Sequence, residues 1–266
     1  MADWLGIEGK TVVVTGASSG IGKAIVDELL ALGVNVANFD IADNGETHDN
    51  LLFQKVDVTS REQVEAAVAA TVERFGTIDA VVNNAGINVP RLLVDPEKPH
   101  GEYELDDTIF EKITMINQKG PYLVSQAVGR ILVDKKDGVI INMASEAGLE
   151  GSEGQSAYAA TKAAVYSYTR SWAKELGKHG VRVVGVAPGI MEATGLRTLA
   201  YEEALGYTRG KTVKQIRAGY ASTSTTPLGR SGKLSEVADL VAYLISKRSS
   251  YITGVTINVA GGKTRG

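Results

Sequence analysis

Two residue types that can move a proton together, a tyrosine and a lysine, stand four positions apart at Tyr158 and Lys162. In a helix this spacing places both side chains on one face. A lysine ammonium beside a phenol favours the phenolate and so lowers the pKa of the tyrosine from its usual value near 10. With a second cation nearby, a pKa of about 7 requires roughly 4 kcal/mol of interaction. The phenolate can then take the proton of an alcohol as a hydride leaves.

The same spacing also occurs at Tyr207/Lys211 and Tyr243/Lys247, so spacing alone does not identify the site. Tyr243 lies in an apolar stretch, where packing is the simpler interpretation, and Tyr207 follows no predicted strand end. Tyr158 differs because it comes shortly after Asn142–Ser145, where a predicted strand ends and the Ser145 hydroxyl can point into a cleft. We therefore predict that this serine, tyrosine and lysine act together in proton transfer.

A glycine-rich turn, Thr15–Gly22, follows the first predicted strand and precedes a predicted helix. Glycines allow a tight turn and let backbone N–H groups approach a pyrophosphate, which the positive end of the helix also attracts. The position of the turn favours dinucleotide binding over a plain structural turn. A nucleoside-triphosphate P-loop is excluded by its spacing, because five residues separate Gly16 from Gly22 and Lys23 precedes an alanine.

Asp40 ends the second predicted strand, about 20 residues beyond the glycine turn, where an acid can accept hydrogen bonds from ribose hydroxyls. Its carboxylate would repel the 2′-phosphate of NADP. The neighbouring Ser18, Ser19 and Ile41 carry no charge to attract that phosphate. The sequence therefore favours NAD, with a turn-initiating aspartate as the alternative.

Elements that alternate along the chain must position these residues. Short apolar runs typical of buried parallel strands occur at Thr11–Val14, Val34–Phe39, Ile78–Val82, Gly138–Asn142, Val181–Val186 and Gly254–Val259. Helical stretches are predicted at Ser19–Leu32, Ser60–Phe75, Phe110–Leu132, Ser156–Leu176 and Ser235–Ile245. The alternation predicts a single α/β domain over 1–266, a doubly wound, Rossmann-like and mainly parallel sheet of about seven strands with helices on both faces.

Two segments interrupt the alternation. Val89–Asp107, with three prolines and six acids, is predicted to be a solvated loop. Met191–Lys233 is long and carries seven bases against three acids, which is typical of a mobile lid that holds an anion. The leading candidates for a substrate phosphate are Arg197 and Arg209, followed by Lys211. An ordinary solvated helix face remains the alternative.

Composition excludes several other classes of protein. The 266 residues include no cysteine, so disulfides and thiolate metal sites are excluded, and the three histidines are too scattered to predict a metal site. A net charge of −3 without a basic block argues against nucleic acid, and no apolar run is long enough for a transmembrane helix. The N-terminus does not resemble a signal peptide. We therefore expect a cytoplasmic enzyme with a small-molecule substrate.

The order of these motifs resembles the short-chain dehydrogenase/reductase family over nearly the whole chain. The matching pieces are Thr15–Gly22, Asp57, Asn83–Gly86, Asn117, Ser145, Tyr158–Lys162 and Pro188-Gly189. The resemblance implies that Ser145 binds the substrate oxygen, Tyr158 is the acid/base, Lys162 lowers its pKa and holds the ribose, and Asn117 anchors a water. With Tyr158 and Lys162, the implied cofactor-binding residues are Gly16, Ser18, Ser19, Gly20, Ile21, Gly22, Asp40, Asp57, Val58, Asn84, Ala85, Gly86, Pro188, Gly189 and Ile190.

Two details depart from the usual pattern of the family. Ala144 replaces the first serine of the usual pair, and Thr194 comes one residue later than the threonine that often contacts the carboxamide. The retained Ser145 is the serine that is expected to act.

A narrower resemblance, carried by Gly189–Arg197, Tyr207–Lys211 and Ala260–Gly266, is to bacterial dehydrogenases of sugar alcohol phosphates. It implies oxidation of D-sorbitol 6-phosphate to D-fructose 6-phosphate with NAD. The alternatives are another polyol or 3-oxoacyl dehydrogenase of the same family, or a dinucleotide sensor without catalysis. Family analogy also implies a homotetramer.

Overall fold

The computed structural model describes residues 4–220 and 222–264, and these form one seven-stranded sheet. The strands are β1 (Thr11–Thr15), β2 (Asn35–Asp40), β3 (Leu51–Lys55), β4 (Ala80–Asn83), β5 (Gly138–Met143), β6 (Val181–Pro188) and β7 (Thr256–Val259). Their order in the sheet is β3-β2-β1-β4-β5-β6-β7, and every neighbouring pair is parallel. The predicted doubly wound α/β fold is therefore confirmed.

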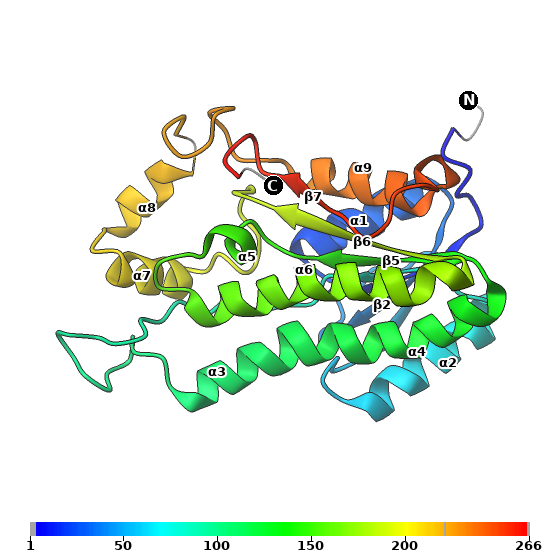
Figure 1. Ribbon diagram of the computed structural model, residues 1–266, viewed down its shortest axis with the longest axis horizontal. Helices are drawn as coiled ribbons and strands as arrows, with labels where there is room; N and C mark the ends of the chain where they lie inside the picture. Colours follow the sequence, from blue (N-terminus) through cyan, green and yellow to red (C-terminus); the bar gives the residue numbers. More distant parts are fainter. Residues whose placement is uncertain (1–3, 221, 265–266) are drawn as a thin grey trace.

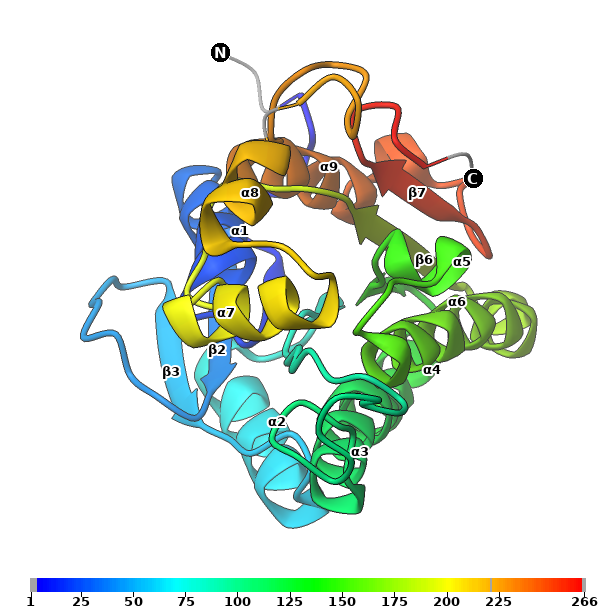
Figure 2. The same cartoon turned by 90° about the vertical axis from the view of Figure 1, so that its left-hand side faces the viewer.

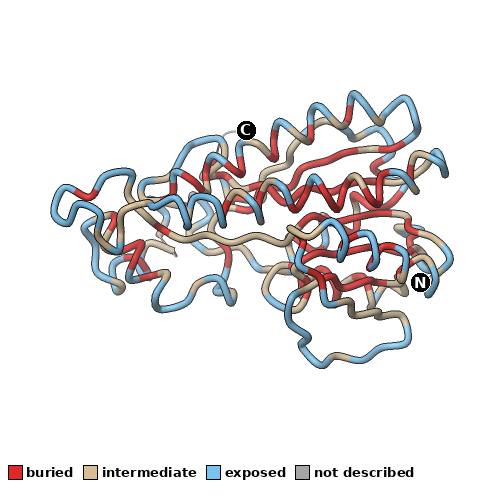
Figure 3. Tube along the Cα trace, turned by 90° about the horizontal axis from the view of Figure 1, so that it is seen from below, coloured by how far each residue is buried: buried red, intermediate tan, exposed pale blue. Residues whose placement is uncertain are grey.

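Helices cover both faces of this sheet (Figure 1). On one face, α1 (Gly20–Ala31) packs against α9 (Leu234–Ile245), and their apolar residues share a core with alternate residues of β1. On the other face lie α2 (Arg61–Phe75), α4 (Gly120–Lys135) and α6 (Ser156–Leu176). Because both faces are covered, β1 is buried at all five positions and reads as the continuous run Thr-Val-Val-Val-Thr. Figure 3 shows this buried layer between exposed helix faces.

The long helix predicted at Phe110–Leu132 contains a change of winding. The structure has α3 at Asp107–Thr114, a π-helical turn (η1) at Met115–Lys119 and then α4. A π turn inserts an extra residue into a helix, and such insertions frequently occur at functional sites. Asn117 lies within this turn.

One strand lay outside the six predicted apolar runs. β3 pairs with β2 at the edge of the sheet, and its residues, Leu-Leu-Phe-Gln-Lys, are partly exposed. Both edge strands, β3 and β7, are partly exposed, but β3 contains no valine or isoleucine and ends in Gln-Lys, so it lacks the Val/Ile signal that marked the other strands.

The two irregular segments lie at the carboxyl ends of the strands. Residues 89–106 contain no helix, as predicted, whereas 191–233 contains α7 (Leu199–Thr208) and α8 (Val213–Gly219). Figure 2 looks onto this end of the molecule, with α7 and α8 in front of the sheet. The strand order reverses between β1 and β4, and ligands of doubly wound sheets bind outside the carboxyl ends at this switch point.

Candidate active site

The glycine turn after β1 is locked against the loop after β4. Gly16 has a φ of +61°, which favours glycine, and a Cβ on Gly22 would lie 2.1 Å from the carbonyl oxygen of Gly16. The Asn84 side-chain amide donates to the carbonyl oxygens of Thr15 and Gly16, at 3.0 and 2.9 Å. The first turn of α1 therefore stays close to the sheet, and its capping residue Ser19 makes no side-chain cap. The free N–H groups of this turn fit a pyrophosphate.

Asp40 stands beside this turn at the end of β2. Its carboxylate accepts hydrogen bonds from the backbone N–H of Ser18 at 2.9 Å and of Ala42 at 3.2 Å. The Ser18 hydroxyl accepts from Asn38 at 3.0 Å. Asp40 lines the cavity described below together with Ile41, whose side chain is exposed. A carboxylate with an apolar neighbour suits ribose hydroxyls better than a phosphate dianion.

A cavity of about 510 Å³ runs from this turn to the predicted catalytic residues. Most of the residues predicted from the sequence line it: Gly16, Ser19, Gly20, Ile21, Asp40, Asp57, Val58, Asn84, Ala85, Gly86, Ser145, Tyr158, Lys162, Pro188, Gly189, Ile190, Thr194, Arg197 and Arg209. Four do not: Ser18, Gly22, Asn117 and Lys211. Ser18 and Gly22 nevertheless belong to the glycine turn: the backbone N–H of Ser18 donates to Asp40, and Gly22 leaves room for the Gly16 carbonyl oxygen. The volume and the donor-rich glycine turn fit a dinucleotide with a small substrate.

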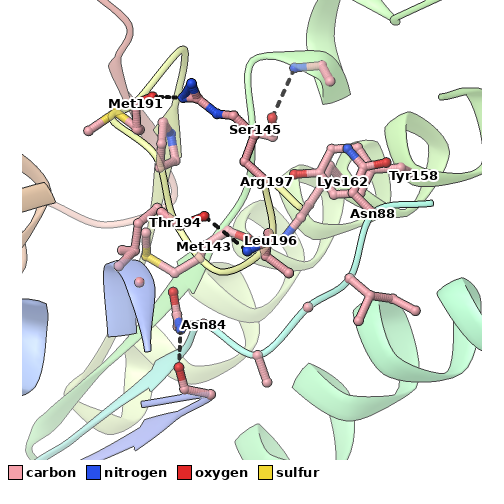
Figure 4. A pocket seen from close by; sticks show the side chains of 18 of the residues that line it. Asn84, Asn88, Met143, Ser145, Tyr158, Lys162, Met191, Thr194, Leu196 and Arg197 are labelled. Carbon is pink, nitrogen blue, oxygen red and sulfur yellow. Dashed lines mark hydrogen bonds between the residues drawn. The ribbon is translucent and has the colours of Figure 1, made fainter. Parts of the chain in front are cut away.

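Tyr158 and Lys162 lie one turn apart on α6 and meet the end of β5 (Figure 4). The Lys162 ammonium lies 5.8 Å from the centre of the Tyr158 ring and donates to the carbonyl oxygen of Met143 at 2.7 Å. Lys162 is buried, and burial lowers the pKa of its ammonium to about 8. Burial likewise raises the pKa of Tyr158 to about 12, against a smaller lowering by its hydrogen bond with Ser145.

In the chain without a bound cofactor, Lys162 therefore does not lower the pKa of this phenol below its usual value. Removal from water disfavours the phenolate more strongly than the surrounding groups of the chain favour it. The lysine ammonium is itself desolvated, and it donates a hydrogen bond to the Met143 carbonyl oxygen. A lowered phenol pKa requires a further positive charge in the site.

Asn117 ties the loop after β4 to the catalytic helix. Its Oδ1 accepts from the backbone N–H of Ile87 at 2.9 Å, and its Nδ2 donates to the Ile87 carbonyl at 2.9 Å and the Thr161 hydroxyl at 3.2 Å. A Cβ on Gly86 would lie 3.3 Å from Asn117 Oδ1 and 3.6 Å from Lys162 Nζ, so the asparagine and the lysine share one small space. The side chain holds this part of the site together, and its role in anchoring a water stays a prediction.

The other two tyrosine–lysine pairs lie elsewhere. Tyr207 donates its hydroxyl to Asp95 at 2.8 Å, and Tyr243 packs on Trp4 with ring centroids 6.4 Å apart. Neither tyrosine lines the cavity, which supports the choice of Tyr158.

Sequence reasoning missed several polar residues of the cavity wall. Glu146, next to the predicted serine, pairs with Lys263 and accepts from Thr264 at 2.9 Å, which brings the C-terminal segment into the site. Tyr201 of α7 and Gln155, which precedes α6, also line the wall. Adjacency to Ser145 was a usable signal for Glu146. No spacing rule pointed to Tyr201 or Gln155, because tertiary packing brings them together.

Comparison with known proteins agrees with this site. The family model described as short chain dehydrogenase matches residues 10–204. A sorbitol-6-phosphate 2-dehydrogenase of Klebsiella pneumoniae is 58% identical over 268 residues, covering 100% of both chains. A 3-oxoacyl-(acyl-carrier-protein) reductase of Thermotoga maritima is 36% identical over 96% of this chain and 98% of its own.

Solved structures show the same fold. A Brucella melitensis 3-ketoacyl-(acyl-carrier-protein) reductase complexed with NADH has a TM-score of 0.81 at 30% identity, over 97% of this chain and 100% of that one. A ligand-free aldohexose dehydrogenase of Thermoplasma acidophilum has a TM-score of 0.83 at 30% identity, over 97% and 95%. The chain belongs to the short-chain dehydrogenase family, and it is an oxidoreductase that uses a nicotinamide dinucleotide.

Two further findings concern residues 4–220 and 222–264. No group of three or more His, Asp or Glu residues in them could hold a metal ion. None of their helices is long and apolar enough to cross a membrane.

We expect Tyr158→Phe to lower kcat at least 1,000-fold, roughly the worth of an essential acid/base, while the Kd for the dinucleotide changes less than about threefold. Only the phenolic proton is removed, and the ring keeps its packing. Tyr207→Phe and Tyr243→Phe serve as matched controls and should keep turnover. Steady-state kinetics and a fluorescence titration with NADH measure the two effects. A comparable loss of turnover in either control would show that the wrong tyrosine has been assigned.

Proposed function

We propose that this protein oxidises D-sorbitol 6-phosphate at C2 to D-fructose 6-phosphate with NAD. The observation that carries the proposal is a pair of arginines, Arg197 and Arg209, in the cavity wall. Arg197 donates to the Met191 carbonyl oxygen and lies 3.8 Å from the centre of the Tyr220 ring, whereas Arg209 donates to Ser152 at 2.9 Å and to the Glu153 carbonyl at 3.3 Å.

Neither guanidinium is paired with a carboxylate within residues 4–220 and 222–264. Two other arginines of the segment are paired, Arg217 with Glu202 and Arg230 with Glu236. Two guanidinium groups that are not neutralised suit a substrate phosphate, which they can bind bidentately. Lys211 is exposed and away from the cavity, so it is the weakest of the three candidates. The 58% identity to the Klebsiella enzyme favours the same substrate.

The roles of the catalytic residues follow from their places. Ser145, hydrogen-bonded to Tyr158, holds the C2 oxygen, and Tyr158 takes the proton of the C2 hydroxyl. Bound NAD would accept the hydride, and its positively charged ring would favour the phenolate that burial disfavours. Lys162 holds the ribose, and Asn117 fixes the loop after β4 through its two hydrogen bonds with Ile87. Segment 191–233 acts as the lid. It carries both arginines that lack a carboxylate partner among the described residues, and its closure would exclude water from the hydride path.

A panel of sugar alcohols and their phosphates, assayed by NADH absorbance, tests the substrate. We expect kcat/KM for D-sorbitol 6-phosphate to exceed that for D-sorbitol by about 100-fold or more, since two charge-assisted contacts are lost with the phosphate. Reduction of a 3-oxoacyl thioester should be slower than that of D-fructose 6-phosphate. Equal turnover of sorbitol and its 6-phosphate would disprove the assignment.

The preference for NAD over NADP is attributed to Asp40, whose carboxylate lies beside the glycine turn. We expect Asp40→Ser combined with Ile41→Arg to shift the ratio of kcat/KM values toward NADP by about 100-fold or more, through removal of a repulsive charge and gain of an attractive one. Ile41→Ser is the control and should keep the preference. A native enzyme that already prefers NADP would contradict the role given to Asp40.

We also infer a cytoplasmic homotetramer. Phe110, Met115 and Tyr122, which lie along the α3–α4 helix, remain exposed in the single chain, and apolar helix faces of this kind pair across two-fold axes. Light scattering at micromolar concentration should give about four times the mass of one chain. A monomer would refute the inference.

A further inference from the structure

A directed chain of hydrogen bonds crosses one wall of the cavity. Arg209 Nη2 donates to the Ser152 hydroxyl at 2.9 Å, Ser152 donates to Gln155 Oε1 at 2.7 Å, and Gln155 Nε2 donates to the Tyr201 hydroxyl oxygen at 2.8 Å. All four residues line the cavity. The guanidinium can only donate, and the Gln155 amide accepts from Ser152 through Oε1 and donates to Tyr201 through Nε2. The chain therefore ends on Tyr201 as an acceptor.

The hydroxyl hydrogen of Tyr201 remains available. No acceptor among the residues that the structure describes receives it, and the ring belongs to the cavity wall. Burial raises the pKa of Tyr201, with a smaller opposing contribution from the Gln155 hydrogen bond, so the residue stays a neutral phenol at ordinary pH. Each bond of the chain polarises the next, which makes the terminal O–H a better donor.

The charges around Tyr201 favour an anionic acceptor. Both Arg209 and Arg197 act on its phenol electrostatically. Glu202, an acid that also acts on it, is buried and accepts two hydrogen bonds from Arg217, at 2.8 and 2.6 Å. Its charge is therefore compensated. A neutral donor that interacts electrostatically with two guanidinium groups, neither of which is paired with a carboxylate in the described part of the chain, suits a phosphate oxygen.

We propose that Tyr201 is a ligand of the substrate phosphate and donates its phenolic O–H to it beside Arg197 and Arg209. The proposal rests on the proposed function, which supplies a phosphorylated substrate. The chain of hydrogen bonds also links this subsite to the catalytic helix, because Gln155 immediately precedes α6 and lies three residues before Tyr158.

Tyr201→Phe tests this ligand, and Tyr207→Phe is the matched control. Both tyrosines are on α7, but Tyr207 donates to Asp95 and does not line the cavity. We expect Tyr201→Phe to raise KM for D-fructose 6-phosphate about 10-fold or more, the effect of one hydrogen bond to a charged acceptor, and to leave kcat/KM for D-fructose unchanged. Competitive inhibition by inorganic phosphate should weaken by a similar factor. The Kd for NADH and the pH profile of kcat should stay as in the native enzyme, as should all values for Tyr207→Phe.

The outcomes separate this proposal from the proposed function. An equal loss on D-fructose and its 6-phosphate would place Tyr201 against the sugar chain and overturn the phosphate role. The phosphate role would also be overturned if inorganic phosphate did not inhibit the native enzyme, or if Tyr207→Phe had an effect equal to that of Tyr201→Phe. If native enzyme instead treats fructose and its 6-phosphate alike, the substrate assignment fails. In that case, inhibition by inorganic phosphate that is weaker in Tyr201→Phe than in the native enzyme would still support Tyr201 as a phosphate ligand.

Discussion

The close approach of the glycine turn to the loop after β4 is the contact on which the rest of the site depends. Gly22 has no room for a Cβ against the Gly16 carbonyl, and the Asn84 amide bridges the two strands on either side of the switch point. This contact fixes where α1 begins and therefore where a pyrophosphate can bind. It also holds the Asn84–Gly86 loop against the catalytic lysine, so cofactor and acid/base share one framework.

Desolvation dominates the chemistry of the catalytic pair. Tyr158 and Lys162 are both shifted toward their neutral forms, the phenol to a pKa of about 12 and the ammonium to about 8. The chain without its cofactor is therefore a poor base. The positive ring of a bound oxidised dinucleotide would favour the phenolate, and proton transfer would then depend on the presence of that cofactor.

The substrate side of the cavity is assembled from segments that are remote in sequence. Glu146 follows β5, Lys263 and Thr264 come from the C-terminal segment, and Tyr201 comes from α7. Hydrogen bonds between Glu146 and the C-terminal segment give the cavity a polar wall beside Ser145. Binding energy for a substrate can thus be adjusted without disturbing the strand ends that carry the reaction.

The sequence by itself determined the alternation of strands and helices and the glycine turn, because these depend on local spacing and on patterns of burial. It also predicted which of three tyrosine–lysine pairs lines the cavity. Tertiary structure alone decided the edge strand β3, whose residues lack the Val/Ile signal of the other strands, and the π turn around Asn117. It also decided the raised pKa of Tyr158 and the partners of Tyr201, since burial and contacts between distant segments arise only when the chain is packed. Local pattern specifies elements, whereas electrostatics depends on what surrounds each group in space.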